Sequence, residues 1–325
     1  MNYYNLHDLL GIESNVEEFP EIFKVDSLQK VDMVINEGHF EVDKDKLKKL
    51  GLKFLGGNDS LYLEYPFYGK SIQKLWINNM LGDPTEFKFS KFTGKFWGVR
   101  GLVYLLMEMK LLQKGCTFIH SGAITSNGKG YLISAWSEMG KSSTVFGLAK
   151  SGYGVLGDDT LILSEDGTVY SYPQVAGIYF HSKNLENLKL SPSQKMKLFL
   201  KYMVSKLPPL HLYINPNLYV DLSSILKVEK SAKLDKCYFL EFGEGEEKLD
   251  KKTAINKMIS STVQALFGQF FTREVFYAYC YLNDINPEFI EERMRKLLDK
   301  TLNDCRIIRS SDKTFYKYIM ENVKV

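Results

Sequence analysis

The feature that most constrains this chain is the stretch of residues 131–150, where an apolar run leads through a short turn into Gly-Lys-Ser-Ser. The run from Tyr131 to Ala135 predicts a buried strand, and the residues after Gly140 predict a helix. A buried strand that turns directly into a helix at such a motif is the setting of a phosphate-binding loop. We therefore expect an α/β fold with a mixed β-sheet core around this loop and helices packed outside.

Each part of the loop has a chemical reason. Backbone N–H groups and the helix N-terminus bind phosphate oxygens, and Gly140 lets the backbone approach them. Lys141 places a positive charge on the β- and γ-phosphates, and Ser142 offers a hydroxyl to Mg²⁺. The predicted nucleotide-binding residues are Ala135, Trp136, Ser137, Glu138, Met139, Gly140, Lys141, Ser142 and Ser143. Ala135 stands where the common motif has glycine, and the alternative is a chance match in an ordinary strand–turn–helix.

Two adjacent carboxylates, Asp158 and Asp159, follow a short apolar strand predicted at residues 155–156. In a phosphate-loop site one such carboxylate binds Mg²⁺, directly or through water. The other can accept the proton of an attacking hydroxyl. The alternative is that both are turn carboxylates without a chemical role.

A hairpin is predicted just before the loop. Residues 116–125 and 130–135 read as strands, and Asn127-Gly128 between them is typical of a two-residue connection. This hairpin delivers the chain into the loop and places His120, on its first strand, near the layer that holds the phosphates. Taken alone, His120 fits a hydrogen-bonded core histidine better than a site residue.

Composition limits the classes of partner. The 325 residues are 45% apolar, and 42 basic against 39 acidic side chains leave a net charge of only +3. Such a balance gives no global attraction to nucleic acid or membrane, so neither is expected as a partner. No apolar run approaches the roughly 20 residues of a spanning helix. The polar N-terminus and four scattered cysteines predict a cytoplasmic protein with reduced thiols.

Outside the site, the pattern predicts a β-rich N-terminal region at residues 1–92 and a catalytic domain at residues 93–325. Strands are expected at 31–36, 39–42 (as a hairpin), 61–65, 160–163, 168–172, 218–222 and 236–241. Helices are expected at 101–113, 191–207, 254–266 and 286–298.

The helix expected at residues 191–207 is rich in lysine, with Lys195, Lys197, Lys201 and Lys206. Its lysines are interpreted as a solvated face. A docking surface for an acidic partner is the alternative.

Three motifs together resemble the catalytic domain of the HPr kinase/phosphorylase family, which belongs with the phosphoenolpyruvate carboxykinase-like P-loop proteins. They are Ile119-His120-Ser121-Gly122, the loop at residues 135–143 and Gly157-Asp158-Asp159, at similar spacings. Tyr172-Pro173 also looks like this wider group. The resemblance covers roughly residues 95–180 and implies that family's mixed sheet around a phosphate loop.

The resemblance also implies roles. Asp158 would be the general base toward a hydroxyl acceptor, Asp159 would assist at the metal, and His120 would lie beside the carboxylates and phosphates. Lys141 and Ser142 would hold ATP and Mg²⁺. Glu138 and Met139 replace small residues usual in the loop, and the charge of Glu138 is expected to weaken nucleotide binding or alter its selectivity. The family's Gly-rich second signature is not found beyond the Asp pair, so the resemblance does not identify HPr as the acceptor.

The function predicted is an ATP-dependent kinase that transfers the γ-phosphoryl group to a serine-like hydroxyl of a protein, peptide or small molecule. One alternative is a non-catalytic nucleotide-binding regulatory module. Another is a carboxykinase-type enzyme acting on a small acid, with Arg100, Arg273 and Lys183 as candidate cations. The acceptor, the nucleotide preference and the formation of a homo-oligomer are left open.

Overall fold

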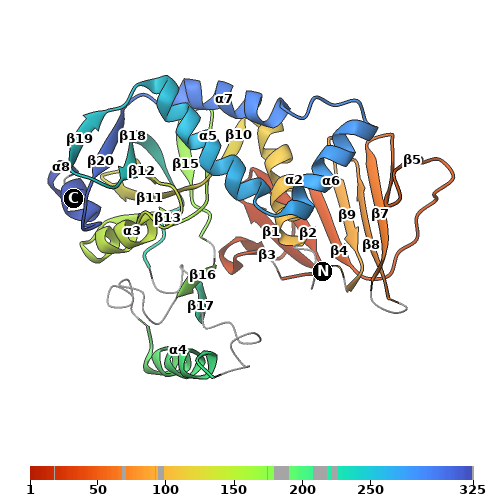
Figure 1. The fold of residues 1–325 in the computed structure, drawn as a ribbon, viewed down its shortest axis with the longest axis horizontal. Helices are drawn as coiled ribbons and strands as arrows, with labels where there is room; N and C mark the ends of the chain where they lie inside the picture. Colours follow the sequence, from red (N-terminus) through yellow and green to blue (C-terminus); the bar gives the residue numbers. More distant parts are fainter. Residues whose placement is uncertain are drawn as a thin grey trace. The chain divides into compact units, whose positions relative to one another are not determined.

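The computed structural model describes residues 1–17, 19–67, 71–91, 93, 99–173, 175–178, 190–207, 218–221 and 226–323. These residues form a mixed α/β fold with two large mixed sheets (Figure 1). Their contacts define two compact units, Met1–Thr117 with Ile259–Leu297 and Phe118–Met258 with Leu298–Val325. These units differ from the predicted ranges 1–92 and 93–325. The reason is that the helices at Val99–Gln113 (α2) and Phe270–Leu282 (α6) pack on strands of the first sheet.

The strands of the first sheet are β1 (Asn2–Leu6), β2 (Leu10–Ser14), β3 (Lys24–Val25), β4 (Met33–Glu37), β5 (Lys48–Leu50), β6 (Phe54–Gly56), β7 (Ser60–Phe67), β8 (Ser71–Asn78) and β9 (Thr85–Phe89). Strand β10 (Cys116–Ile119) follows them in the chain and belongs to the second sheet. The other strands are β11 (Ser121–Ser126), β12 (Lys129–Ser134), β13 (Gly154–Gly157), β14 (Leu161–Ser164), β15 (Thr168–Tyr170), β16 (Val175–Ile178), β17 (Leu218–Asp221), β18 (Ser231–Glu241), β19 (Gly245–Lys248) and β20 (Cys305–Arg309). The helices are the short η1 (Glu21–Phe23), α2 (Val99–Gln113), α3 (Lys141–Lys150), α4 (Pro192–Ser205), α5 (Lys251–Phe267), α6 (Phe270–Leu282), α7 (Phe289–Thr301) and α8 (Phe315–Asn322).

The first unit is built on a nine-stranded sheet with the order β3-β1-β2-β4-β9-β8-β7-β6-β5. The predicted strand at 61–65 is confirmed as part of β7, and the one at 31–36 as β4. The hairpin predicted from 31–36 to 39–42 is wrong, because residues 39–42 lie outside any strand. Strand β4 pairs instead in parallel with β2 and β9. Local alternation identified the strand, but it does not choose the strand's partners.

Helix α2 confirms the helix predicted at residues 101–113, and it ends at Gln113 just before Lys114-Gly115. Its side chains are buried on most faces, including the fully buried Lys110. The Lys110 ammonium compensates for its burial by an ion pair of 2.8 Å with Asp83. Helix α6, which the sequence analysis did not predict, packs against α2 and against β5, β6 and β7.

The second unit is built on a sheet with the order β10-β14-β15-β18-β12-β11-β13, and β20 pairs with β18 and β19. The predicted hairpin before the loop is confirmed as β11 and β12. Its turn places Asn127 and Gly128 at positive φ, as a two-residue connection requires. The strands predicted at 160–163 and 168–172 are confirmed as β14 and β15, which pair antiparallel to each other. Helix α3 packs across β11, β12 and β13 (Figure 1).

The other predicted elements are also found among the described residues. Strands β17 and β18 and helices α4, α5 and α7 correspond to the elements expected at 218–222, 236–241, 191–207, 254–266 and 286–298. The four cysteines are free and buried, and Cys237 and Cys305 lie opposite each other on the parallel strands β18 and β20. In the described part of the chain, no helix has the length and apolar character needed to cross a membrane.

Candidate functional site

Strand β11 brings the predicted site residues together, because it is antiparallel to both of its neighbours. Its first residue, Ser121, lies opposite Ser134, the last residue of β12. On the other side, Ala123 lies opposite Gly157, the last residue of β13. The starting end of β11 therefore lies beside the ends of both neighbouring strands. His120, the loop after β12 and the carboxylates after β13 meet at this edge of the sheet.

The strand predicted at residues 116–125 is interrupted at His120. Strand β10 before the interruption pairs with β14, whereas β11 after it pairs with β12 and β13. The change of partners falls at His120, whose imidazole contacts the loop lysine. The fold thus positions His120 at the junction of two strands and not in the middle of one.

The loop at residues 135–140 leaves the core and then enters helix α3. Ala135 is buried in the hydrophobic core of the unit, whereas Trp136 is 58% exposed. Glu138 and Gly140 both have positive φ, 65° and 104°. Gly140 accepts this conformation without the steric cost that a Cβ imposes, while Glu138 bears that cost. Helix α3 then begins at Lys141 without a side-chain cap, so the N–H groups of its first turn remain available to an anion.

The side chain of Lys141 lies between a histidine and a carboxylate. Its Nζ atom is 2.8 Å from Nε2 of His120 and 3.2 Å from Oδ1 of Asp159. An ammonium group only donates hydrogen bonds, so Nε2 of His120 is the acceptor and Nδ1 carries the proton. That Nδ1 atom lies 3.5 Å from Oδ1 of Asp159. The three side chains form a closed cycle of contacts at the mouth of the loop.

Burial explains the electrostatics of this cycle. It lowers the pKa of Lys141, against the opposing effect of Asp159 and Asp158. Burial, followed by the charge of Lys141, also lowers the pKa of His120. His120 is therefore neutral at pH 7, as its role of acceptor requires.

Asp158 is the buried member of the carboxylate pair, with an exposure of 7%. Burial, followed by the charge of Asp159, raises its pKa to about 6. The charge of Lys141 and a hydrogen bond from Ser142 act in the opposite direction. A carboxylate with a pKa near the working pH is suited to accept a proton and release it again.

The close approach of helix α3 to strand β11 explains why position 122, just after His120 and Ser121, is occupied by glycine. A Cβ atom at Gly122 would lie 2.6 Å from Cγ2 of Val145 on α3. The helix can therefore approach β11 closely only because this position has no side chain. The same position faces the backbone of Asp158, with a Cβ distance of 3.5 Å to its Cα atom.

The residues present fit a bound Mg²⁺ only together with phosphates. Among the described residues, no group of three or more His, Cys, Asp or Glu side chains could hold a metal ion alone. Mg²⁺ usually takes one or two protein ligands and completes its shell with water and substrate phosphates. Ser142 in the first turn of α3 and the half-exposed carboxylate of Asp159 match that kind of donor set.

One residue that the sequence did not single out contacts the loop. Lys313, shortly before helix α8, donates a hydrogen bond of 2.9 Å from Nζ to the carbonyl oxygen of Glu138. Its Cβ atom also lies 3.7 Å from the position of a Cβ at Gly140. Lys313 thereby supports the left-handed backbone of Glu138. No local motif marks this lysine, because the contact spans 175 residues.

Two of the three candidate cations of the carboxykinase alternative lie among the described residues. Arg100 and Arg273 belong to the first unit, where Arg100 stacks on Tyr104 at 5.8 Å from its ring centre. Lys183 lies outside the described residues.

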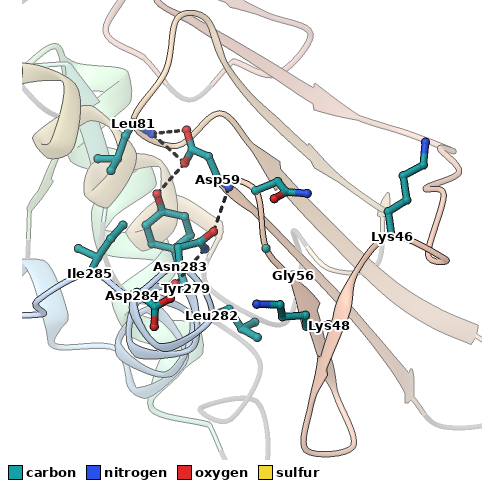
Figure 2. A pocket seen from close by; sticks show the side chains of 12 residues that line it. Lys46, Lys48, Gly56, Asp59, Leu81, Tyr279, Leu282, Asn283, Asp284 and Ile285 are labelled. Atoms are coloured by element: carbon teal, nitrogen blue, oxygen red, sulfur yellow. Dashed lines mark hydrogen bonds between the residues drawn. The ribbon is translucent and has the colours of Figure 1, made fainter.

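The first unit contains a separate pocket of about 480 Å³ between β6 and the end of α6 (Figure 2). Its most conspicuous polar group, Asp59, accepts hydrogen bonds from the Tyr279 hydroxyl at 2.6 Å and from the Leu81 N–H at 3.2 Å. The Asp59 N–H donates to the side chain of Asn283 at 2.9 Å. These groups satisfy one another and attach α6 to the β6–β7 turn. We interpret them as structural.

Comparison with known proteins gives no family for this chain. No protein-family model matches it, and no curated protein matches it. The resemblance to the HPr kinase/phosphorylase family stays a prediction, and the chemistry of the site rests on the contacts described above.

Proposed function

We propose that this protein is a Mg²⁺-dependent kinase that transfers the γ-phosphoryl group of ATP to a serine-like hydroxyl of a protein, peptide or small molecule. The observation that carries the proposal is the environment of Asp158. A buried carboxylate whose pKa is raised to about 6 lies beside the lysine and serine that begin a helix after a glycine turn. Purely structural carboxylates are usually exposed or fully paired.

In this proposal the uncapped N-terminus of α3 binds the phosphates of ATP, and Lys141 exchanges its contact with Asp159 for a phosphate oxygen. Ser142 and Asp159 hold Mg²⁺, which neutralises charge on the phosphates. Asp158 accepts the proton of the acceptor hydroxyl. Neutral His120 orients the Lys141 ammonium through its Nε2 atom. The proposed reaction requires ATP and Mg²⁺, which the cytoplasm supplies, so the proposed location is the cytoplasm.

A nucleotide-binding module without turnover is the second candidate, and one observation favours it. The Lys141 ammonium is already engaged by His120 and Asp159, and Glu138 adds a negative charge at the loop. A site in this state could bind nucleotide only weakly and never complete the transfer. The described residues hold no comparable observation for the carboxykinase alternative.

The two candidates are separated by following γ-labelled ATP with Mg²⁺ in an extract of the source organism. Wild type, Asp158→Asn and Asp284→Asn are compared. Asp284 is an exposed aspartate of the other unit, so its variant controls for the same chemical change. Binding of a fluorescent ATP analogue is measured in parallel for all three.

The kinase proposal requires label to move onto an acceptor with wild type and Asp284→Asn, and not with Asp158→Asn, while all three bind nucleotide. Nucleotide binding without transfer by any of them would favour the regulatory module. Transfer by Asp158→Asn at the wild-type rate would remove Asp158 as the base. Failure of wild type to bind nucleotide would refute both candidates.

A further inference from the structure

Helix α4 exposes an unusual number of large apolar side chains. Met196, Phe199, Leu200 and Met203 are between 42% and 58% exposed. Leu198 on the same helix is fully buried in the core of the second unit. The start of the helix is fixed by a capping box between Ser191 and Gln194. The helix is therefore attached by one side while it presents apolar groups on another.

The exposed apolar side chains form one stripe. Successive residues of an α-helix are rotated by about 100°, which places the four of them within an arc of about 100°. Leu198 lies roughly opposite the centre of that arc. The attachment of α4 thus directs the stripe away from the core that holds Leu198.

Lysines border the stripe on both sides. Lys195 and Lys197, one residue before and one after Met196, lie about 100° to either side of it. Both are exposed, as is Lys206 after the helix end. Residues 191–207 contain no acidic side chain. Lysines in this arrangement can extend their amines sideways while the apolar stripe enters a less polar phase.

We propose that α4 is an interfacial helix that binds an anionic phospholipid surface, with its apolar stripe among the lipid headgroups and the bordering lysines on their phosphates. A helix with an apolar face and a lysine-rich border is the usual form of such an anchor. The charge is complementary, because an anionic leaflet attracts each nearby lysine.

The geometry disfavours the other occupants. In a dimer formed through two copies of α4, the lysines of the two helices would face one another, and neither helix offers an acidic side chain to pair with them. A partner protein that enclosed α4 in a groove would have to displace Leu198 from the core of the second unit. A flat lipid surface contacts only the face that is exposed.

This inference departs from the expectation drawn from net charge. A total of +3 averages over the whole chain, whereas the attraction to a membrane acts within a Debye length of about 8–10 Å. What matters is the local excess on α4. The inference does not depend on the proposed kinase activity, because membrane binding can be measured without nucleotide.

The test uses the full-length protein and vesicles of phosphatidylcholine with or without 30% phosphatidylglycerol. The four native cysteines are buried, so a Met203→Cys variant can be labelled selectively with an environment-sensitive dye. We expect binding to the anionic vesicles in flotation and a blue shift of the dye. Both should weaken strongly between 50 and 500 mM salt.

Two double variants separate charge from insertion. Lys195→Gln with Lys197→Gln should weaken binding roughly 25-fold, about fivefold for each lysine. Leu200→Ser with Met203→Ser should weaken it at least about tenfold, because the stripe no longer inserts. Lys48→Gln with Lys49→Gln, exposed lysines of β5, is the matched control and should leave binding unchanged. Circular dichroism confirms that each variant is folded.

Several results would overturn the proposal. One is a failure of the wild-type protein to bind anionic vesicles at 50 mM salt. Another is a control pair that weakens binding as much as the α4 pair, which would mean attraction by total charge. A dimer in analytical ultracentrifugation that Leu200→Ser with Met203→Ser dissociates would assign the stripe to a second copy. A dye that responds to polyglutamate and not to vesicles would assign it to an acidic polypeptide.

Discussion

Replacing Asp158 by asparagine should stabilise the protein at neutral pH, although it removes the proposed base. Burial raises the pKa of this carboxyl from 3.8 to about 6. Below about pH 4 it is protonated in the folded and the unfolded chain alike, so it costs nothing. As the pH rises from about 4 to 6, the unfolded chain releases the proton first and stability falls. Above pH 6 the full cost of the buried charge is present.

The magnitude follows from the size of the shift. Each unit of pKa corresponds to about 1.4 kcal/mol, so a shift from 3.8 to about 6 costs about 3 kcal/mol at pH 7.5. Asparagine has nearly the same shape and can still accept the hydrogen bond from Ser142, but it carries no charge. For a unit of this size, about 3 kcal/mol raises the melting temperature by roughly 6–12 °C.

The assay is thermal unfolding of wild type and Asp158→Asn at pH 7.5 and pH 4.5, without nucleotide. The variant should melt well above wild type at pH 7.5, and at pH 4.5 the difference should fall to about a third, because only about 1 kcal/mol of the cost remains there. Asp159→Asn is the control. Its half-exposed carboxylate pairs with Lys141 at 3.2 Å but also repels Asp158, and these effects oppose each other, so its loss should shift the melting temperature at pH 7.5 less than Asp158→Asn does. An equal difference between wild type and Asp158→Asn at both pH values would refute the reasoning, because the effect would then be independent of ionisation.

Three other changes test the loop and the first unit. Gly140→Ala meets no atom closer than 3.7 Å, so its cost is the strain of a φ of 104°, about 1–2 kcal/mol in thermal unfolding. Lys313→Met removes the bond that holds Glu138 at positive φ, and titration with fluorescent ATP should show affinity reduced about fivefold. Tyr279→Phe removes a 2.6 Å hydrogen bond to Asp59 and should lower the free energy of unfolding in urea by about 1.5–3 kcal/mol, with ATP binding unchanged.

The elements predicted correctly from the sequence are those encoded within a short stretch. The Asn127-Gly128 turn defines the β11–β12 hairpin, because few residues tolerate its positive φ. The capping box at Ser191 and the adjacent Pro192 define the start of α4. In each case the information lies in a few neighbouring residues.

What was not predicted, the partners of several strands and helix α6, depends on packing between distant segments. Strand β18, the parallel neighbour of β12, comes from residues about a hundred positions later, and nothing in either strand specifies the other. Helix α6 returns to the first sheet through a similarly distant contact. The false hairpin at residues 39–42 has the same cause. Alternation indicates a strand, while the choice of its neighbours is decided by the whole sheet.

The candidate site was readable from sequence for a topological reason. The three segments that form it are connected by one hairpin and one helix, since β12 and β13 lie on either side of β11 and α3 crosses between them. A strand–helix–strand connection between parallel strands of one sheet can be built in very few ways. The residues that follow β12 and β13 must then lie at the start of β11. Lys313 and the orientation of α4 have no such local constraint, and only the folded chain reveals them.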